Sequence, residues 1–206
     1  MLGLALMAGC TAPPVRVTNP QRVLIVADSF LAGSTTFTFP SIEPRLRHLL
    51  APSGIDVRLV GRENFRVIED NWPVVVRDEV AAYDPDLVIL QSSVPDHATG
   101  PSRSRLVTAW AWVYAMAARR GADVWRVDPP DPQPGSFIDV LYSPTRHALR
   151  TAQRDGGIFG AVNRPTVVAL NPAIAVCDSP WTFDGGHLDD SGQWCAAGEL
   201  ARLILG

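Results

Sequence analysis

The stretch RVLIVADSFLAG, residues 22–33, decides the fold. Its five apolar residues, Val23 to Ala27, predict a buried strand, and the chain turns polar directly afterwards, at Asp28 and Ser29. Strand-like and helix-like segments then alternate along the rest of the chain. This alternation predicts an α/β domain built as a three-layer, doubly wound sheet of about five mostly parallel strands. Because such sheets place their sites at the carboxyl ends of the strands, Ser29 stands where chemistry is expected.

The further elements are predicted from apolar periodicity and from turn residues. Predicted strands cover residues 57–60, 87–90, 124–127 and 166–170. Predicted helices cover residues 41–50, 74–83, 103–120 and 191–205. We expect one more helix within residues 139–154 and place its start after Pro144. The Pro-rich segment 128–135 is expected to be a surface loop that rims the site.

Composition limits the class of protein. The chain has 206 residues, of which 47% are hydrophobic and 19% charged, and its formal net charge is −3. This balance indicates one globular domain with a substantial core. The sequence holds no basic stripe large enough for a nucleic acid, so we expect no nucleic-acid partner. No stretch reaches the roughly 18 uninterrupted apolar residues that a transmembrane helix needs.

The N-terminal residues MLGLALMAGC resemble the leader of a bacterial lipoprotein. Small residues precede Cys10, as in the lipobox at which such a leader is cleaved and the cysteine acylated, although no Lys or Arg precedes the apolar run. We therefore expect residues 1–20 to be a leader and Pro-rich tether, and residues 21–206 to be the domain. A lipid on Cys10 would anchor the protein to the membrane of the cell envelope, outside the cytoplasm. The alternative is an ordinary cysteine in a frayed terminus.

Two further cysteines, Cys177 and Cys195, form an even pair in a chain that would be exported. We expect a disulfide between them, stapling the loop that carries His187. The alternative is a pair of buried free thiols. We expect no metal, because no Cys or His pair has the short spacing of zinc ligands.

A base is needed near Ser29, because a serine hydroxyl alone is a poor nucleophile. Of the four histidines, His187 lies in the glycine-rich stretch FDGGHLDDSG, with Asp184 three residues earlier. In such a loop the aspartate can reach back to the imidazole, fix its tautomer and stabilise the imidazolium. Asp96 and His97, at the end of the third strand, are an alternative acid–base pair.

The ADSF motif near the N-terminus, with DGGHL near the C-terminus, resembles the two outer blocks of the SGNH hydrolases, or GDSL-like esterases. The resemblance covers residues 21–206 and implies the flavodoxin-like SGNH hydrolase fold. It also implies that Ser29 is the nucleophile, His187 the base and Asp184 its orienting acid, with no metal or organic cofactor.

The resemblance further implies an oxyanion hole formed by the backbone N–H groups of Ser29 and Gly61. The third block departs from the family, because the stretch ILQSSVPDH aligns Ser93 with the usual glycine and Pro95 with the usual asparagine. The asparagine donor is therefore missing from its usual place. Replacements for it are sought among the side chains of Asn64, Gln91, Ser92 and Ser93.

These observations predict an extracytoplasmic serine esterase that acts on acylated carbohydrates of the cell envelope or on other small esters. An O-acyltransferase with the same triad is one alternative. A non-catalytic glycan-binding domain is another, and Pro95 favours it. A cytosolic lysophospholipase-type enzyme would require Cys10 to have no role. We expect a monomer.

Overall fold

The computed structural model describes residues 19–35, 38–92, 102–128, 131–160, 165–182 and 184–206. Within these ranges, five strands form one sheet in the order β2-β1-β3-β4-β5, and every neighbouring pair is parallel. The strands are β1 (Arg22–Asp28), β2 (Asp56–Arg62), β3 (Leu87–Gln91), β4 (Asp123–Asp128) and β5 (Thr166–Ala169). The predicted doubly wound parallel sheet is confirmed.

Strand β1 occupies the position where the winding of the sheet reverses. The chain runs from β1 to β2 on one side, and then returns to place β3 on the other side of β1. Ligands of such sheets bind outside the carboxyl ends of the strands at this switch point. Residues Val23 to Ala27 are wholly buried, because β1 is paired on both edges and covered on both faces. A continuous apolar run is what such a strand requires.

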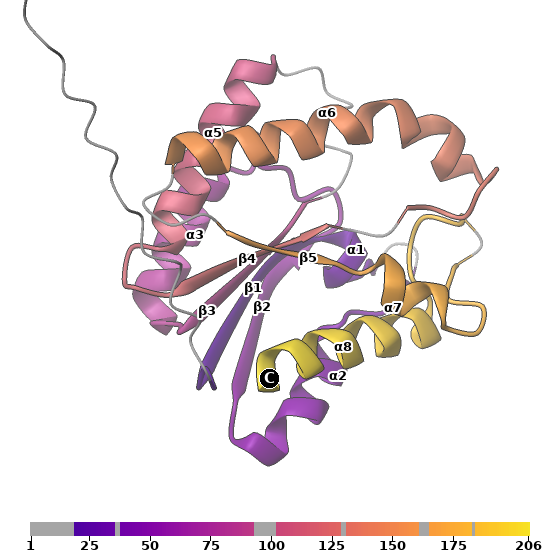
Figure 1. Cartoon of the computed structure of the whole chain (residues 1–206), viewed down its shortest axis with the longest axis horizontal. Helices are drawn as coiled ribbons and strands as arrows, with labels where there is room; N and C mark the ends of the chain where they lie inside the picture. The colour runs from indigo at the N-terminus through magenta and orange to yellow at the C-terminus, as the bar shows by residue number, and fades with distance from the viewer. Residues whose placement is uncertain (1–18, 36–37, 93–101, 129–130, 161–164, 183) are drawn as a thin grey trace, which may run out of the picture.

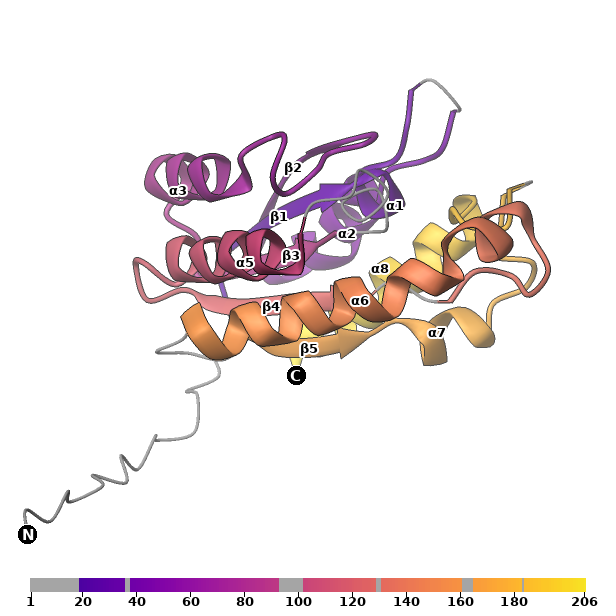
Figure 2. The same cartoon turned by 90° about the horizontal axis from the view of Figure 1, so that it is seen from above.

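Helices cover both faces of the sheet (Figure 1). One face packs against α1, α2, α7 and α8, and the other packs against α3 and α5. Helix α6 lies along α5, so α3, α5 and α6 run side by side over that face (Figure 2). The helices are α1 (Ser29–Ala32), α2 (Glu43–Leu50), the 3-10 turn η1 (Ala51–Ser53), α3 (Trp72–Tyr83), α5 (Arg103–Ala117), α6 (Phe137–Gly160), α7 (Asn171–Ala175) and α8 (Asp190–Leu205).

The start of α6 differs from the prediction, because the helix begins at Phe137 and Pro144 lies inside it. Ser136 caps this start: its hydroxyl accepts the backbone N–H of Asp139 at 3.1 Å. The Asp139 carboxylate in turn accepts the N–H of Gly135 at 3.0 Å. The first bond satisfies an N–H group that a helix start leaves open, and the second ties the first turn of the helix to Gly135. The cap therefore fixes the helix start well before the proline.

The predicted disulfide is present. Cys177, just after α7, is bonded to Cys195 in α8, and their Cα atoms lie 6.4 Å apart. The bridge closes the loop that leads from α7 to α8 at the carboxyl edge of the sheet. Over the described ranges, none of the helices combines the length and apolar character needed to cross a bilayer.

Candidate active site

Ser29 is the first residue of α1, directly after β1. Asp28 holds this junction: its buried carboxylate accepts the backbone N–H of Phe30 at 3.1 Å and the side-chain amide of Gln91 at 2.9 Å. The first bond caps α1, and the second ties the cap to the end of β3. Ser29 is thereby fixed at the switch point of the sheet, as the sequence predicts.

Asp184 organises the loop between α7 and α8. One carboxylate oxygen accepts the backbone N–H groups of Gly186 and His187, at 2.8 and 3.0 Å, and the hydroxyl of Thr182 at 2.8 Å. The other oxygen lies 2.6 Å from Nδ1 of His187. One side chain therefore shapes the loop and orients the imidazole.

The ends of this loop are fixed as well. Trp181 and Leu188 form an antiparallel bridge, and the N–H of Thr182 donates to the carbonyl of His187 at 3.0 Å. Asp189 then caps α8 by accepting the N–H of Gly192 at 2.8 Å. The loop is closed at its base, so Asp184 and His187 are held in a fixed relation to α8.

The structure brings His187 to Ser29, 158 positions away in the sequence, with Nε2 3.0 Å from the serine Oγ. Because an ionised carboxylate only accepts hydrogen bonds, Nδ1 carries the proton that faces Asp184. Nε2 is then left with a lone pair toward the Ser29 hydroxyl. This is the arrangement in which a histidine can take the proton of a serine nucleophile.

The Asp184 carboxyl stays ionised in this setting. Burial by itself raises its pKa, but the hydrogen bonds from Gly186, His187 and Thr182 outweigh that effect. The pKa therefore lies below its ordinary value. An ionised Asp184 can stabilise the imidazolium that forms when His187 accepts a proton.

Two residues from other parts of the chain contact the imidazole and the segment after Ser29. The ring of Phe39 stacks on the imidazole of His187, with centroids 4.3 Å apart. Gln193, a buried residue of α8, donates its side-chain amide to the carbonyl of Phe30 at 2.8 Å. Neither residue could be identified from the sequence, because their partners lie far away along the chain. An apolar ring and a lone glutamine carry no motif that marks them.

The segment before α6 contacts the loop that carries Asp184 and His187. The N–H of Gln133 donates to the carbonyl of Gly185 at 2.8 Å. A Cβ on Gly185 would collide with Ser136, and one on Gly186 would collide with Ile138. The two glycines of the DGGH motif thus allow close packing, in addition to the positive φ of 65° at Gly185. The predicted surface loop contacts the site loop, as expected.

The predicted oxyanion residues are only partly described. Gly61 lies within β2 in register with Ala27, two residues before Ser29, and a Cβ on it would collide with the carbonyl of Ala27. Asn64 follows in a turn with a positive φ of 54°. Ser93, Pro95, Asp96, His97 and Cys10 lie outside the described residues. Their predicted roles, and the oxyanion roles of Gly61 and Asn64, stay predictions.

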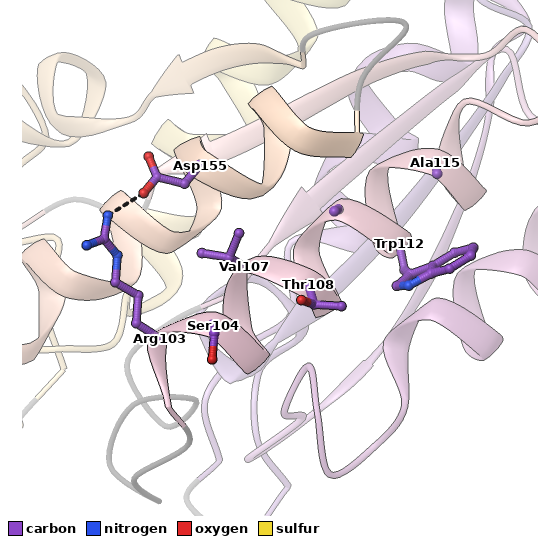
Figure 3. A pocket seen from close by; sticks show the side chains of 8 residues that line it. Arg103, Ser104, Val107, Thr108, Trp112, Ala115 and Asp155 are labelled. Atoms are coloured by element: carbon purple, nitrogen blue, oxygen red, sulfur yellow. Dashed lines mark hydrogen bonds and ion pairs between the residues drawn. The ribbon is translucent and has the colours of Figure 1, made fainter.

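Two hollows lie on different sides of the domain. One, of about 560 Å³, is lined by residues 32–35, 39, 41 and 61–64, and it includes Gly33, which bonds to the carbonyl of Ser29, and Phe39, which stacks on His187. The other, of about 820 Å³, is lined by the outer face of α5 and by Asp155, which pairs with Arg103 (Figure 3). The larger hollow contains none of the triad residues. Its size alone therefore does not make it the active site.

The described residues hold no cluster of three or more His, Cys, Asp or Glu side chains arranged to bind a metal ion. The site predicted from the sequence requires no metal and therefore no such cluster.

Comparison with known proteins gives similarity at the level of structure. No protein-family model and no curated protein sequence matches the chain. A lipase/acylhydrolase from Enterococcus faecalis is similar with a TM-score of 0.68 and 19% identity, over 90% of this chain and 96% of that one. A protein from Slackia heliotrinireducens, proposed as an SGNH hydrolase, is similar with a TM-score of 0.66 and 18% identity, over 90% of this chain and 99% of that one.

A family 3 carbohydrate esterase from Clostridium thermocellum is also similar, with a TM-score of 0.62 and 14% identity over 90% of this chain and 98% of that one. At such identities the likeness concerns the fold, which is the fold implied by the ADSF and DGGHL motifs. The chain has the SGNH hydrolase fold.

Proposed function

We propose that this protein is a serine esterase, an acyl hydrolase of the SGNH type that cleaves ester-linked acyl groups. The observation that carries the proposal is the chain of contacts from Ser29 Oγ to His187 Nε2 at 3.0 Å, and from His187 Nδ1 to Asp184 at 2.6 Å. A nucleophile, a base and an orienting acid in this order are what acyl transfer requires. The fold supports the proposal, because the similar structures include an acylhydrolase and an esterase.

The reaction begins when Ser29 Oγ attacks the ester carbonyl carbon and His187 Nε2 takes the hydroxyl proton. The tetrahedral intermediate collapses, the bond to the alcohol oxygen breaks, and His187 returns the proton to the leaving alcohol. Water then attacks the acyl-enzyme with the same histidine as base, which releases the acid and regenerates Ser29. Asp184 keeps the proton on Nδ1 throughout and stabilises the imidazolium.

The negative charge on the carbonyl oxygen needs hydrogen-bond donors. The backbone N–H groups of Ser29 and Gly61 are proposed for this role, with Asn64 or Ser93 as a further donor. Gly61 is proposed because it lies near the end of β2, in register with Ala27, two residues before Ser29. One such donor contributes about 2.7–4 kcal/mol to transition-state stabilisation in studied hydrolases.

The proposed place of action is outside the cytoplasm. The Cys177–Cys195 disulfide supports this, because disulfides persist in oxidising compartments. The lipobox-like sequence before Cys10 supports an anchor in the cell envelope. Acylated carbohydrates are the substrates proposed there, because one structural neighbour is a carbohydrate esterase.

The test is hydrolysis of p-nitrophenyl acetate by the purified chain, compared with Ser29→Ala and His187→Ala. Ser53→Ala and His48→Ala are matched controls, because both residues are exposed and lie outside the triad. The proposal predicts turnover by the parent and by both controls, with loss in the two triad variants. Turnover that survives Ser29→Ala would exclude Ser29 as the nucleophile.

A further inference from the structure

The cavity of about 560 Å³ beside the triad has two walls. One wall is formed by residues 32–35, 39 and 41, among which Ser34 and Phe39 pair as a small antiparallel bridge. The other wall is the end of β2 and the following turn, residues 61–64. Its volume falls within the roughly 300–1,000 Å³ that is usual for small-molecule sites.

Two residues that line the cavity, Gly33 and Phe39, contact Ser29 and His187. Gly33, in its wall, donates its N–H to the carbonyl of Ser29 at 2.9 Å, one helical turn away. Phe39, also in its wall, stacks on the imidazole of His187. We therefore expect a group joined to an ester carbonyl at Ser29 to extend toward this cavity.

Polar side chains line much of this space. Glu63 extends from the β2 side, and the buried hydroxyl of Ser34 donates to its carboxylate at 2.6 Å. This bond crosses from one wall to the other and fixes the carboxylate between them. A carboxylate offers about four acceptor positions, and Ser34 occupies one. Glu63 can therefore accept hydrogen bonds from the hydroxyl groups of a ligand.

The polar lining favours binding of the alcohol part of the ester in this cavity over binding of a long acyl chain. An apolar chain placed here would remove the Glu63 carboxylate from water with no hydrogen bond in return, which is costly. Arg62, the neighbouring cation, pairs with Asp70 and lies over the ring of Phe65 at 5.6 Å. Arg62 also lines the cavity, but Asp70 balances its charge, whereas no cation is paired with Glu63 among the described contacts. The cavity presents a negative acceptor, which disfavours an anionic ligand.

We propose that this cavity binds the leaving alcohol, that the alcohol is an uncharged polyol such as a sugar ring, and that Glu63 determines this specificity. The inference rests on the proposed esterase function and names where its substrate's alcohol lies. Glu63 acts by accepting ligand hydroxyls, and Ser34 acts by holding the Glu63 carboxylate in place.

Binding tests the proposal without depending on turnover. The chain carrying Ser29→Ala is titrated with methyl 3-O-acetyl-glucoside and with methyl 3-O-acetyl-glucuronide, which differ in one carboxylate. The proposal predicts that the neutral glycoside binds more tightly, by roughly tenfold. Adding Glu63→Ala weakens binding of the glucoside by roughly tenfold to a hundredfold, as expected for a lost hydrogen bond to a charged group. Adding Glu63→Gln, which keeps the shape, removes the preference for the neutral ligand.

Controls separate this inference from general damage. Glu199→Gln and Glu199→Ala alter an exposed pair with Arg202 on α8 and are expected to leave both dissociation constants unchanged. Ser34→Ala is expected to shift binding in the same direction as Glu63→Ala, by a smaller factor. Circular dichroism melting curves identify any variant that fails to fold. If Glu63→Ala fails to fold, the binding constants of Glu63→Gln test the inference.

Several results would overturn the inference. They are no measurable binding of the glucoside, equal binding of the two glycosides, or dissociation constants that do not respond to Glu63→Gln and Glu63→Ala. The triad is tested separately by the p-nitrophenyl acetate assay. Loss of turnover in Ser29→Ala with no effect of Glu63 on glycoside binding would reject the subsite and retain the esterase. Glycoside binding that depends on Glu63, in a chain without turnover, would reject the esterase and retain a polyol-binding cavity.

Discussion

A carboxylate oxygen of Asp184 lies 2.6 Å from Nδ1 of His187, while the other oxygen of the same group accepts the backbone N–H of His187 at 3.0 Å. One aspartate therefore fixes both the position of the histidine backbone and the tautomer of its ring. This double contact explains why the two residues stand three positions apart. With fewer residues between them no turn could form. The two glycines form the turn that directs the imidazole ring back toward the Asp184 carboxylate.

Asp184→Asn is expected to abolish most of the activity while leaving the loop folded. The asparagine oxygen can still accept the N–H groups of Gly186 and His187, but its amide would donate to Nδ1. The proton then moves to Nε2, which can no longer accept from Ser29. By analogy with triads of this kind, we expect kcat for p-nitrophenyl acetate to fall by roughly 10⁴-fold.

The control for that variant is Asp190→Asn. Asp190 is an exposed residue at the start of α8, and it pairs with Arg45 rather than with the triad. Its removal is expected to change kcat by less than about twofold, because exposed ion pairs contribute little. Equal losses in the two variants would contradict a special role for Asp184.

The same carboxyl predicts how stability depends on pH. Hydrogen bonds hold the folded-state pKa of Asp184 below its ordinary value of 3.8, so the ionised form is favoured by folding. The stability that this contributes is complete above the pKa of the unfolded chain and is lost as pH falls through the folded pKa. The gap in unfolding free energy between the parent and Asp184→Asn should therefore shrink below about pH 4. Urea unfolding at pH 7 and pH 3 measures it, and a constant gap would contradict the prediction.

The disulfide is expected to stabilise the loop that carries Asp184 and His187. Replacing both Cys177 and Cys195 by alanine should lower the free energy of unfolding by about 3 kcal/mol, because the bond closes a loop with a sequence separation of 18. Urea unfolding of the oxidised parent and the double variant measures the difference. Dithiothreitol should destabilise the parent and have no effect on the variant. Similar destabilisation of both by the reductant would show that another bond is responsible.

Gly61→Ala should destabilise the domain and reduce activity. The added methyl group would collide with the carbonyl oxygen of Ala27, two residues before Ser29, so β1 and β2 must separate. We expect a loss of about 1–3 kcal/mol in unfolding free energy, as for overpacking in a core. Gly198→Ala in α8 is the matched control: it meets open space in a helix and should stabilise by up to about 1 kcal/mol. Thermal unfolding of both variants decides, and equal effects would contradict the packing argument.

Some parts of the fold and site followed from local sequence. The run from Val23 to Ala27 is apolar on both faces, as a central parallel strand requires, and it ends at the carboxyl edge where Ser29 lies. Asp184 and His187 are close in sequence and joined by glycines, so their contact is a local property. These features could be predicted because neighbouring residues alone determine them.

Other features depend on contacts between distant segments. The stacking of Phe39 on His187 requires the chain to reverse after Ser34 and then meet a loop almost 150 positions later. The five-residue helix α7 is too short for a periodic pattern to identify it. Helix α6 begins ahead of the predicted start after Pro144, because Ser136 and Asp139 cap it there, a signal that the sequence does contain.

The central claim is that Ser29 is a nucleophile activated by His187, and covalent labelling tests it most directly. The purified chain is treated with a fluorophosphonate, whose phosphorus is attacked by an activated serine Oγ with loss of fluoride, and the adduct is located by peptide mass spectrometry. The account predicts one adduct, on Ser29, that forms much more slowly in His187→Ala and at the parent rate in His48→Ala. An adduct on another residue, or labelling of Ser29 at the same rate without His187, would contradict it.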